Sequence, residues 1–546
     1  MPRLALSLTL SLLATVPALL SAQPGAAQAA EAATACGSAD AAVACTETGA
    51  VRGVAEGATL AFKGIPYAKP PVGDLRWRPP RPAEAWSGVR DGSKTGPSCP
   101  QLSGKEVVGS EDCLTVNVWK PQDTPAAQGA GQAAKRPVMV WFTGGGNHSL
   151  SGQGTAQYGG VTYDGEAMAA RGVVFVSFNY RLGALGFLAH PALDAERTET
   201  VSGNYGSLDQ IALLGWVRRN IAAFGGDPER VTVFGTSAGG ANICALMTAP
   251  AAKGLFASAS MQSSVPTGCE LPTLAEAEAR TGNRVVSALA CEGGSDVAAC
   301  LRGKSMAEVV NAVPGTFGVF PRIYGPNVDG HVFPQQPISR IRAGAHVPVI
   351  IGNSAEETMQ FVDAAGPVTD EAGYAAAVER IFGSKARGAV LARYPATRYG
   401  SPRRALVQAT TDALFTCTSR RVARAIADAQ TKPVFRYLFA HTLENDPAFK
   451  AAGINHTIEH PFFYAWKGKY QPTADDLAIQ RLMLASWTNL ARAGNPNGAG
   501  APSWPAVAAG ADTLLTIGAA SATAGQGPAE ANCGFWDGIE LPAPHL

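Results

Sequence analysis

Short apolar runs alternate with longer segments of helical periodicity through much of the chain. Five runs are apolar at nearly every position, which is typical of strands buried on both faces of a parallel sheet. Between the second and third runs, "SLDQIALLGWVRRNIAAF" (207–224) repeats its apolar residues at helical spacing. Strands joined through such helices form right-handed crossovers, which place helices on both faces of the sheet. The five predicted strands are 138–142, 173–179, 231–234, 347–352 and 434–440.

The rest of the pattern favours one large folded unit. The chain has 546 residues, enough to bury a large core. "LTVNVWKP" (114–121) is a further predicted strand, and the small, polar stretch 121–137 predicts a surface loop. Residues 271–344 contain several helical fragments and are expected to leave the sheet and cap one end of it. Because no linker divides the chain, we predict that residues 30–546 form a single domain.

The first residues differ from the rest of the chain. One basic residue precedes an apolar run from Leu4 to Leu20, and small residues follow, as in a secretory signal peptide. The stretch 27–29 fits the cleavage rule, so residues 1–29 are the predicted signal peptide. A membrane anchor is the alternative, but the run is short for a bilayer span and Pro17 interrupts it. We expect a secreted or periplasmic protein without stable membrane insertion after cleavage.

The charges nearly balance, since 44 basic and 43 acidic residues give a formal net charge of +1. This balance provides no general attraction for nucleic acid or anionic membrane, so no nucleic-acid partner is expected. The ten cysteines predict disulfides in a chain that leaves the cytoplasm, and their spacing predicts no zinc site. Short separations predict three local disulfides, and four cysteines stay unassigned. The predicted pairs are Cys36–Cys45, Cys99–Cys113 and Cys291–Cys300; the unassigned residues are Cys244, Cys269, Cys417 and Cys533.

A serine between glycines follows one of the buried strands. "FGTSAGG" (234–240) ends the strand "VTVF", and the next residues have a helical composition. A strand, Gly-x-Ser-x-Gly and a helix form a nucleophile elbow, whose sharp turn leaves no room for side chains around the serine. The turn exposes the hydroxyl and directs the first helical N–H groups toward its target. Ser237 is therefore the predicted nucleophile.

A triple glycine follows the strand 138–142, in "FTGGGNHSLSGQG". Three glycines let backbone amides approach a substrate oxygen without interference from a Cβ atom. A flexible turn is the alternative. Because an elbow follows later in the chain, the glycines are predicted to bind the oxyanion of a tetrahedral intermediate.

Several long motifs show a family resemblance. They include "FKGIPYAKPPVGDLRWRPP", "SEDCLTVNVWKP", "FVSFNYRLGALGFL" and "MQSS". With these the chain resembles the type-B carboxylesterases, the cholinesterase-like branch of the α/β-hydrolases, over nearly all of its mature length. The resemblance implies an α/β-hydrolase fold, with a large, mostly parallel central sheet, helices on both faces and inserted capping segments. It also implies a serine hydrolase of small-molecule carboxylic esters that needs no metal or cofactor.

The resemblance also assigns the other site residues. In "VPVIIGNSAEETMQF" it places the charge-relay acid on Glu357, with Glu356 as the preceding acid. The alternative is that both glutamates are solvated loop charges. The base should follow the acid in chain order, and His456 matches the family's Gly-x-x-His-x-x-Glu segment. His460, outside this motif and before Pro461, is the weaker choice.

The resemblance assigns the oxyanion hole to the amides of Gly145, Gly146 and Ala238. The implied mechanism is acyl transfer to water, in which the base takes the serine proton and the acid orients the base.

The chain departs from the family pattern around the expected cleft. Thr143 and Asn147 flank the glycines where the family has His or Tyr and an aromatic residue, so a more polar cleft floor is expected. Thr236 stands where the family commonly has glutamate. The loop between Cys99 and Cys113 has no aromatic residue for a choline cation, so choline esters are not expected substrates. The glycosylation patterns at Asn147 and Asn455 are taken as coincidence.

Two alternatives stay open at this point. One is a catalytically silent relative that uses the fold for binding or adhesion. The presence of Ser237, Glu357 and His456 argues against it. The other is a hydrolase that prefers amides, carbamates, thioesters or lipids. The sequence does not indicate the oligomeric state.

Overall fold

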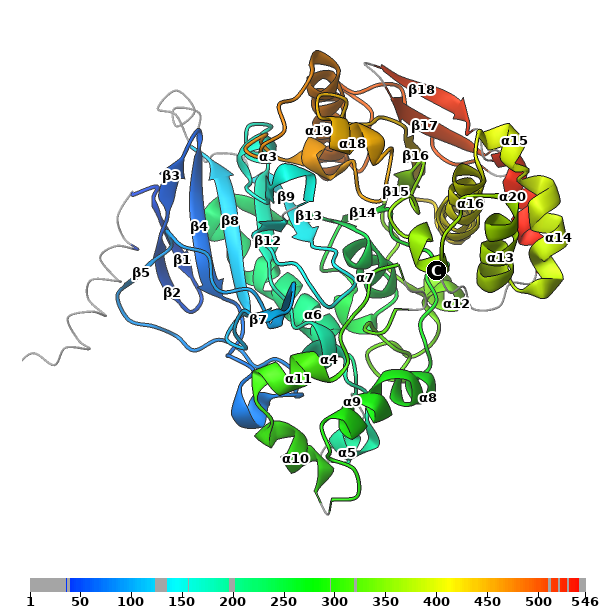
Figure 1. Cartoon of the computed structure of the whole chain (residues 1–546). Helices are drawn as coiled ribbons and strands as arrows, with labels where there is room; N and C mark the ends of the chain where they lie inside the picture. Colours follow the sequence, from blue (N-terminus) through cyan, green and yellow to red (C-terminus); the bar gives the residue numbers. More distant parts are fainter. Residues whose placement is uncertain are drawn as a thin grey trace, which may run out of the picture.

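One sheet of eleven strands runs through the computed structural model (Figure 1). The predicted signal peptide and most of the predicted loop at 121–137 lie outside the residues that the structure describes. The described residues are Cys36, 40–122, 135–155, 157–195, 202–294, 296–318, 322–508, 512–518, 521–527 and 530–539.

The sheet is parallel in its centre and antiparallel at its edges. Its order is β18-β17-β16-β15-β14-β13-β9-β12-β8-β4-β3, and all neighbours from β17 to β12 are parallel. The mostly parallel central sheet predicted from the sequence is confirmed, and all five predicted buried strands belong to it. The strands are β3 (Val54–Glu56), β4 (Thr59–Pro66), β8 (Thr115–Pro121), β9 (Arg136–Phe142), β12 (Val174–Phe178), β13 (Gly226–Thr236), β14 (Ser258–Gln262), β15 (Val349–Ser354), β16 (Val434–Phe439), β17 (Thr513–Gly518) and β18 (Ser521–Gln526).

Alternate residues of the central strands enter two hydrophobic cores. In β9, Val138 and Val140 belong to one core and Met139 and Trp141 to the other, because side chains of a strand point alternately to opposite faces. The first core includes apolar residues of α6 (Tyr205–Asn220), and the second those of α19 (Ala474–Ala493). The fully apolar runs of the sequence therefore reflect burial of both faces of the sheet.

Two helical segments are inserted between strands that follow the elbow in the sequence. The first lies between β14 and β15 and confirms that residues 271–344 leave the sheet. The second lies between β15 and β16 and forms a separate core with α20 (Glu530–Asp537), at the right of Figure 1. The first contains α8 (Leu274–Ala277), α9 (Asn283–Ala288), α10 (Val297–Gly303), α11 (Met306–Ala312) and α12 (Pro337–Arg340). The second contains α13 (Glu371–Phe382), α14 (Ser384–Arg393), α15 (Ala396–Tyr399), α16 (Pro402–Thr411) and α17 (Cys417–Ala429).

Shorter elements complete the described structure. Three small sheets lie outside the central one. Their strands are β1 (Val43–Thr46), β2 (Gly49–Arg52), β5 (Val89–Asp91), β6 (Gln101–Ser103), β7 (Glu106–Val108), β10 (Gly154–Thr155) and β11 (Val161–Thr162). The remaining helices are α3 (Glu166–Ala169), α4 (Gly183–Phe187), α5 (Pro191–Asp194), α7 (Ala238–Leu246) and α18 (Pro447–Ala451).

All ten cysteines form disulfides in the structure. The three local pairs expected from the spacing are present. The four unassigned cysteines pair as Cys244–Cys269, which ties α7 to the start of the first inserted segment, and Cys417–Cys533, which ties α17 to α20. Among the described residues, no helix has the length and apolar character needed to cross a membrane.

Candidate active site

Ser237 lies on a sharp turn between β13 and α7. Its φ of 53° and ψ of −123° are strained values for a residue with a side chain. A Cβ atom on Gly235 or Gly239 would lie 2.6 or 2.1 Å from the carbonyl oxygen of Phe142, at the end of β9. These contacts leave room only for glycine, so the "FGTSAGG" motif follows from the close approach of the two chain segments.

The Ser237 side chain opens onto a cavity of about 340 Å³. The cavity brings together the serine, the triple glycine, the His456 segment and both inserted segments. This size suits a small organic molecule. The lining residues are Gly144, Gly145, Gly146, Leu150, Thr236, Ser237, Thr316, Phe317, Gly318, Arg322, Gln360, Phe361, Ala364, His456, Thr457 and His460.

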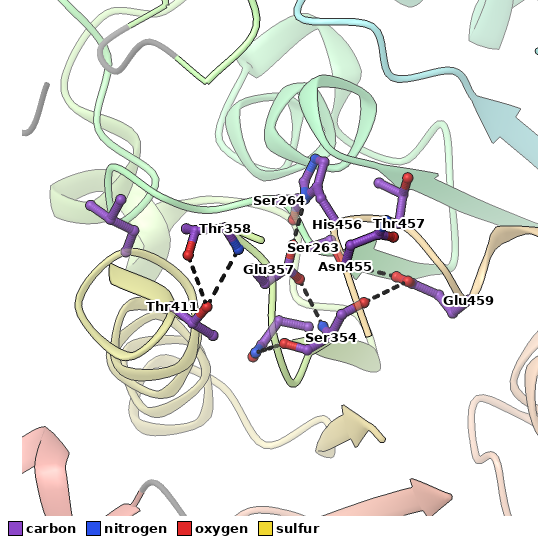
Figure 2. A network of polar contacts seen from close by, with 12 residues as sticks. Ser263, Ser264, Ser354, Glu357, Thr358, Thr411, Asn455, His456, Thr457 and Glu459 are labelled. Atoms are coloured by element: carbon purple, nitrogen blue, oxygen red, sulfur yellow. Dashed lines mark hydrogen bonds and ion pairs between the residues drawn. The ribbon is translucent and has the colours of Figure 1, made fainter. Parts of the chain in front are cut away.

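His456 is joined to Glu357 behind the cavity wall. Its Nδ1 forms a short hydrogen bond with Glu357 Oε2 (Figure 2). Glu357 is fully buried, and its Oε1 accepts a 2.7 Å bond from the Ser354 amide at the end of β15. The carboxylate therefore holds the ring in one orientation and leaves Nε2 available to the cavity.

Glu356 has a different environment from its neighbour. It is part-exposed and forms an ion pair of 3.1 Å with Arg404. Its Oε2 also accepts a 2.9 Å bond from the amide of Ile454, shortly before His456. The alternative that both glutamates are solvated loop charges does not hold for Glu357, because its side chain is inaccessible to solvent.

Glu459 is a buried residue for which the sequence suggested no role. Ser263 Oγ and Ser354 Oγ each donate a 3.0 Å bond to its carboxylate (Figure 2). Tyr437 OH donates a third bond at 3.3 Å. Burial raises the pKa of Glu459, and the nearby Glu357 charge adds to this effect. Through Ser354, Glu459 ties the His456 segment to the loop that carries Glu357. Two features of the sequence could have indicated this role. Glu459 ends the Gly-x-x-His-x-x-Glu segment, and its partner Ser263 lies in the "MQSS" motif.

The triple-glycine loop presents its amides beside the serine. Gly145 and Gly146 have φ values of 86° and 62°, a region that favours glycine. Within the described residues, neither amide has a hydrogen-bond partner, whereas the Gly145 carbonyl accepts from His148 and Ser149. The loop is therefore held from its carbonyl side, and its N–H groups remain available for a ligand.

The expectation that Thr143 and Asn147 make the cleft floor more polar is wrong. Both side chains are buried and neither lines the cavity. Asn242 in α7 donates a 2.8 Å bond to Asn147 Oδ1, and Tyr180 OH donates to the Thr143 carbonyl. Asn147 thus attaches the glycine loop to the helix behind the serine.

His460 also lines the cavity but has no acidic partner. Within the described residues neither ring nitrogen has a hydrogen-bond partner, and the ring lies 4.9 Å from that of Trp141. Burial lowers the pKa of His460 to about 3, and the neighbouring His456 contributes, so the ring is neutral at physiological pH. None of the described residues orients His460 as Glu357 orients His456.

The part of the chain that forms this sheet, elbow and cavity matches a known protein family. A model of the carboxylesterase family matches residues 40–536, nearly all of the described structure. The chain belongs to the carboxylesterase family. It is therefore a hydrolase that acts on carboxylic esters, with the α/β-hydrolase fold.

Similar proteins include esterases from bacteria and from humans. The fumonisin B1 esterase of Sphingopyxis macrogoltabida is 37% identical over 84% of this chain and 83% of its own. The para-nitrobenzyl esterase of Bacillus subtilis (strain 168) is 35% identical, covering 84% and 91%. The cocaine esterase of Homo sapiens is 34% identical, covering 81% of each chain. Each is thus similar over most of both chains.

Proposed function

We propose that Ser237, His456 and Glu357 form the catalytic triad of this carboxylesterase. The observation that carries the proposal is that Ser237 and His456 line one cavity, while His456 Nδ1 is bonded to the buried Glu357. This is the order of contacts that activates a serine: nucleophile, base and orienting acid.

In the proposed mechanism, His456 Nε2 takes the Ser237 proton as the oxygen attacks the ester carbonyl. Glu357 stabilises the imidazolium that forms. His456 then gives the proton to the leaving alcohol, and an acyl group remains on Ser237. Water, activated by the same histidine, attacks the acyl-enzyme and releases the acid. Within the described residues the free Ser237 hydroxyl makes no hydrogen bond to His456, and such contacts commonly tighten only when substrate binds.

We assign the oxyanion hole to the amides of Gly145, Gly146 and Ala238. The first two have no internal partner among the described residues, and the third opens α7 directly after the nucleophile. At this helix end the N–H groups point outward, and the helix dipole favours negative charge.

We further propose that the substrates are esters without a choline cation. Thr236, which lines the cavity next to Ser237, is neutral, and the loop between Cys99 and Cys113 offers no aromatic ring. A cationic alcohol would therefore find neither a carboxylate nor a π face at these places. We also expect faster turnover of esters than of matched amides, carbamates or thioesters.

The test is labelling with an organophosphate followed by mass spectrometry. We expect one adduct, on Ser237, and loss of nitrophenyl ester hydrolysis in step with labelling. Ser237→Ala should remain folded and lose nearly all activity, whereas Ser287→Ala, at an exposed position of α9, should match the wild type. Absence of an adduct from active, folded protein would contradict the proposed nucleophile.

We propose that the protein is secreted or periplasmic, with residues 30–546 as one domain. The five disulfides support the proposed location, because such bonds persist in oxidising compartments. Sequencing the amino terminus of the exported protein would locate the cleavage site, predicted after residue 29.

A further inference from the structure

Arg322 is a cation in the wall of the catalytic cavity. Within the described residues it forms no ion pair. In the described part of the chain, its one hydrogen bond runs from Nη2 to the carbonyl oxygen of Ser264, at a long 3.5 Å. A guanidinium has five N–H donors, so most of those of Arg322 are unused by the protein.

The position of this charge is energetically unfavourable in the free protein. Burial lowers the pKa of Arg322 to about 10, which leaves the side chain charged at physiological pH. A partly buried charge without a partner lowers the free energy of unfolding, so such residues are usually paired. The missing partner at a cavity wall indicates a ligand that brings its own negative charge.

The surroundings of the cavity favour an anion over a cation. No aspartate or glutamate lines the cavity in the described part of the chain. Burial and the Arg322 charge lower the pKa of the neighbouring His148 to about 4, so that ring is neutral. Glu357 lies behind His456 and is fully buried. Within the catalytic cavity, a negatively charged group beside Arg322 would therefore meet no facing carboxylate. Arg322 also lines a neighbouring cavity, whose lining includes Glu270.

The mechanism indicates which part of the ester lies near Arg322. The leaving alcohol must reach His456 and so lies along the wall of His456, Thr457 and His460. Arg322 belongs to another wall, contributed by the first inserted segment, and its charge also acts on Tyr180 behind the glycine loop. The acyl group extends from the carbonyl carbon away from the alcohol, and we therefore assign it to this second wall.

We propose that Arg322 binds a carboxylate on the acyl group of the substrate, so that the preferred substrates are monoesters of dicarboxylic acids. A planar guanidinium matches a carboxylate through two parallel hydrogen bonds. This inference rests on the proposed mechanism, because it uses His456 to locate the alcohol.

The experiment compares matched esters that differ by one charge. Monoethyl succinate and monoethyl glutarate carry the carboxylate, and ethyl 4-methylpentanoate and ethyl 5-methylhexanoate replace it with an isopropyl group. A second pair, 2-carboxyethyl butanoate and 3-methylbutyl butanoate, places the charge on the alcohol. We expect wild-type kcat/KM to favour a charged acyl ester over its isostere, and no such preference in the alcohol pair.

Substitutions then assign the preference to Arg322. Because hydrogen bonds to charged groups are strong, Arg322→Met should lower kcat/KM for the charged acyl esters about 10- to 100-fold. The neutral esters should change less than about threefold, within the range of a surface substitution. Arg322→Lys should restore part of the preference, and Arg342→Met, at an exposed arginine, should behave like the wild type.

Three results would overturn the inference. They are no charge preference in the wild type, a preference confined to the alcohol pair, and equal losses on charged and neutral esters in Arg322→Met. The last result would show that Arg322 only supports the cavity wall. In each case, labelling of Ser237 and turnover of the neutral esters would show that the proposed mechanism still stands. Failure to hydrolyse any ester would instead count against that mechanism.

Discussion

At the scale of single residues, Glu356 and Glu357 show how neighbours in sequence acquire different roles. The first pairs with Arg404 at the surface, and the second is buried against His456. The family pattern indicated which glutamate to choose, but local sequence could not, because both follow the same strand. Arg322 was not foreseen at all, since only the fold brings it into the same cavity as Ser237. No local pattern distinguishes an unpaired arginine from a solvated one.

We predict that Glu357→Gln lowers kcat about 10³- to 10⁴-fold, because a neutral amide can hold the wrong tautomer of His456 and cannot stabilise its charged form. Glu356→Gln removes only the pairing with Arg404 and should change kcat by less than about fivefold, as expected for a part-exposed ion pair. Steady-state kinetics on a nitrophenyl ester compares the two variants. Equal losses would contradict the separate roles of the two glutamates.

His460 makes the stability of the protein depend on pH. Its pKa is lowered to about 3 from an ordinary value of 6.5. Between these pH values the unfolded chain binds a proton that the folded chain does not, so the free energy of unfolding falls as the pH drops below about 6.5.

We predict that His460→Phe is less sensitive to acid, because phenylalanine has no proton to bind and matches the surrounding aromatic rings. Calorimetric melting from pH 7 to pH 4 should show a smaller fall in Tm for His460→Phe than for the wild type. Parallel curves for the two proteins would contradict the assignment of this acid sensitivity to His460.

At the scale of elements, the buried strands and α6 were predictable because their apolar runs are continuous or periodic. The strand β14, with the sequence "SASMQ", was missed because its small and polar residues carry no such signal. It is buried throughout, and its strand identity follows from pairing with β13 and β15. The second inserted segment was also not singled out, since its helices form a core only with distant α20.

The close packing at the elbow predicts that two helical glycines respond in opposite ways to replacement by alanine. Gly239→Ala should lower the free energy of unfolding by about 1–3 kcal/mol and reduce activity, because its Cβ would meet the Phe142 carbonyl at 2.1 Å. A Cβ atom on Gly388, in α14, would meet no atom within 4 Å. Gly388→Ala should therefore raise the free energy of unfolding by about 0.5–1 kcal/mol. Denaturant unfolding and ester hydrolysis measure both effects. Similar stabilities for the two variants would contradict this account of the motif.

At the scale of the whole molecule, the disulfides differ in how much chain they enclose. Cys417–Cys533 spans 116 residues and Cys36–Cys45 spans nine. Because the entropy lost by the unfolded chain grows with loop length, the two bonds should contribute about 5 and about 2.5 kcal/mol. Replacing Cys417 and Cys533 with serine should therefore lower the guanidinium midpoint more than replacing Cys36 and Cys45. The reverse order would contradict this loop-length argument.

The five disulfides share an ordering that bears on how the protein matures. Taken in chain order, the ten cysteines are bonded as five successive pairs, from Cys36–Cys45 to Cys417–Cys533. A chain that crosses a membrane amino terminus first exposes its thiols in this same order. An oxidant that joins each newly exposed thiol to the one before it would produce the native set directly. If the chain is exported as proposed, maturation of the active enzyme should need a disulfide-forming catalyst but no isomerase to rearrange wrong pairs.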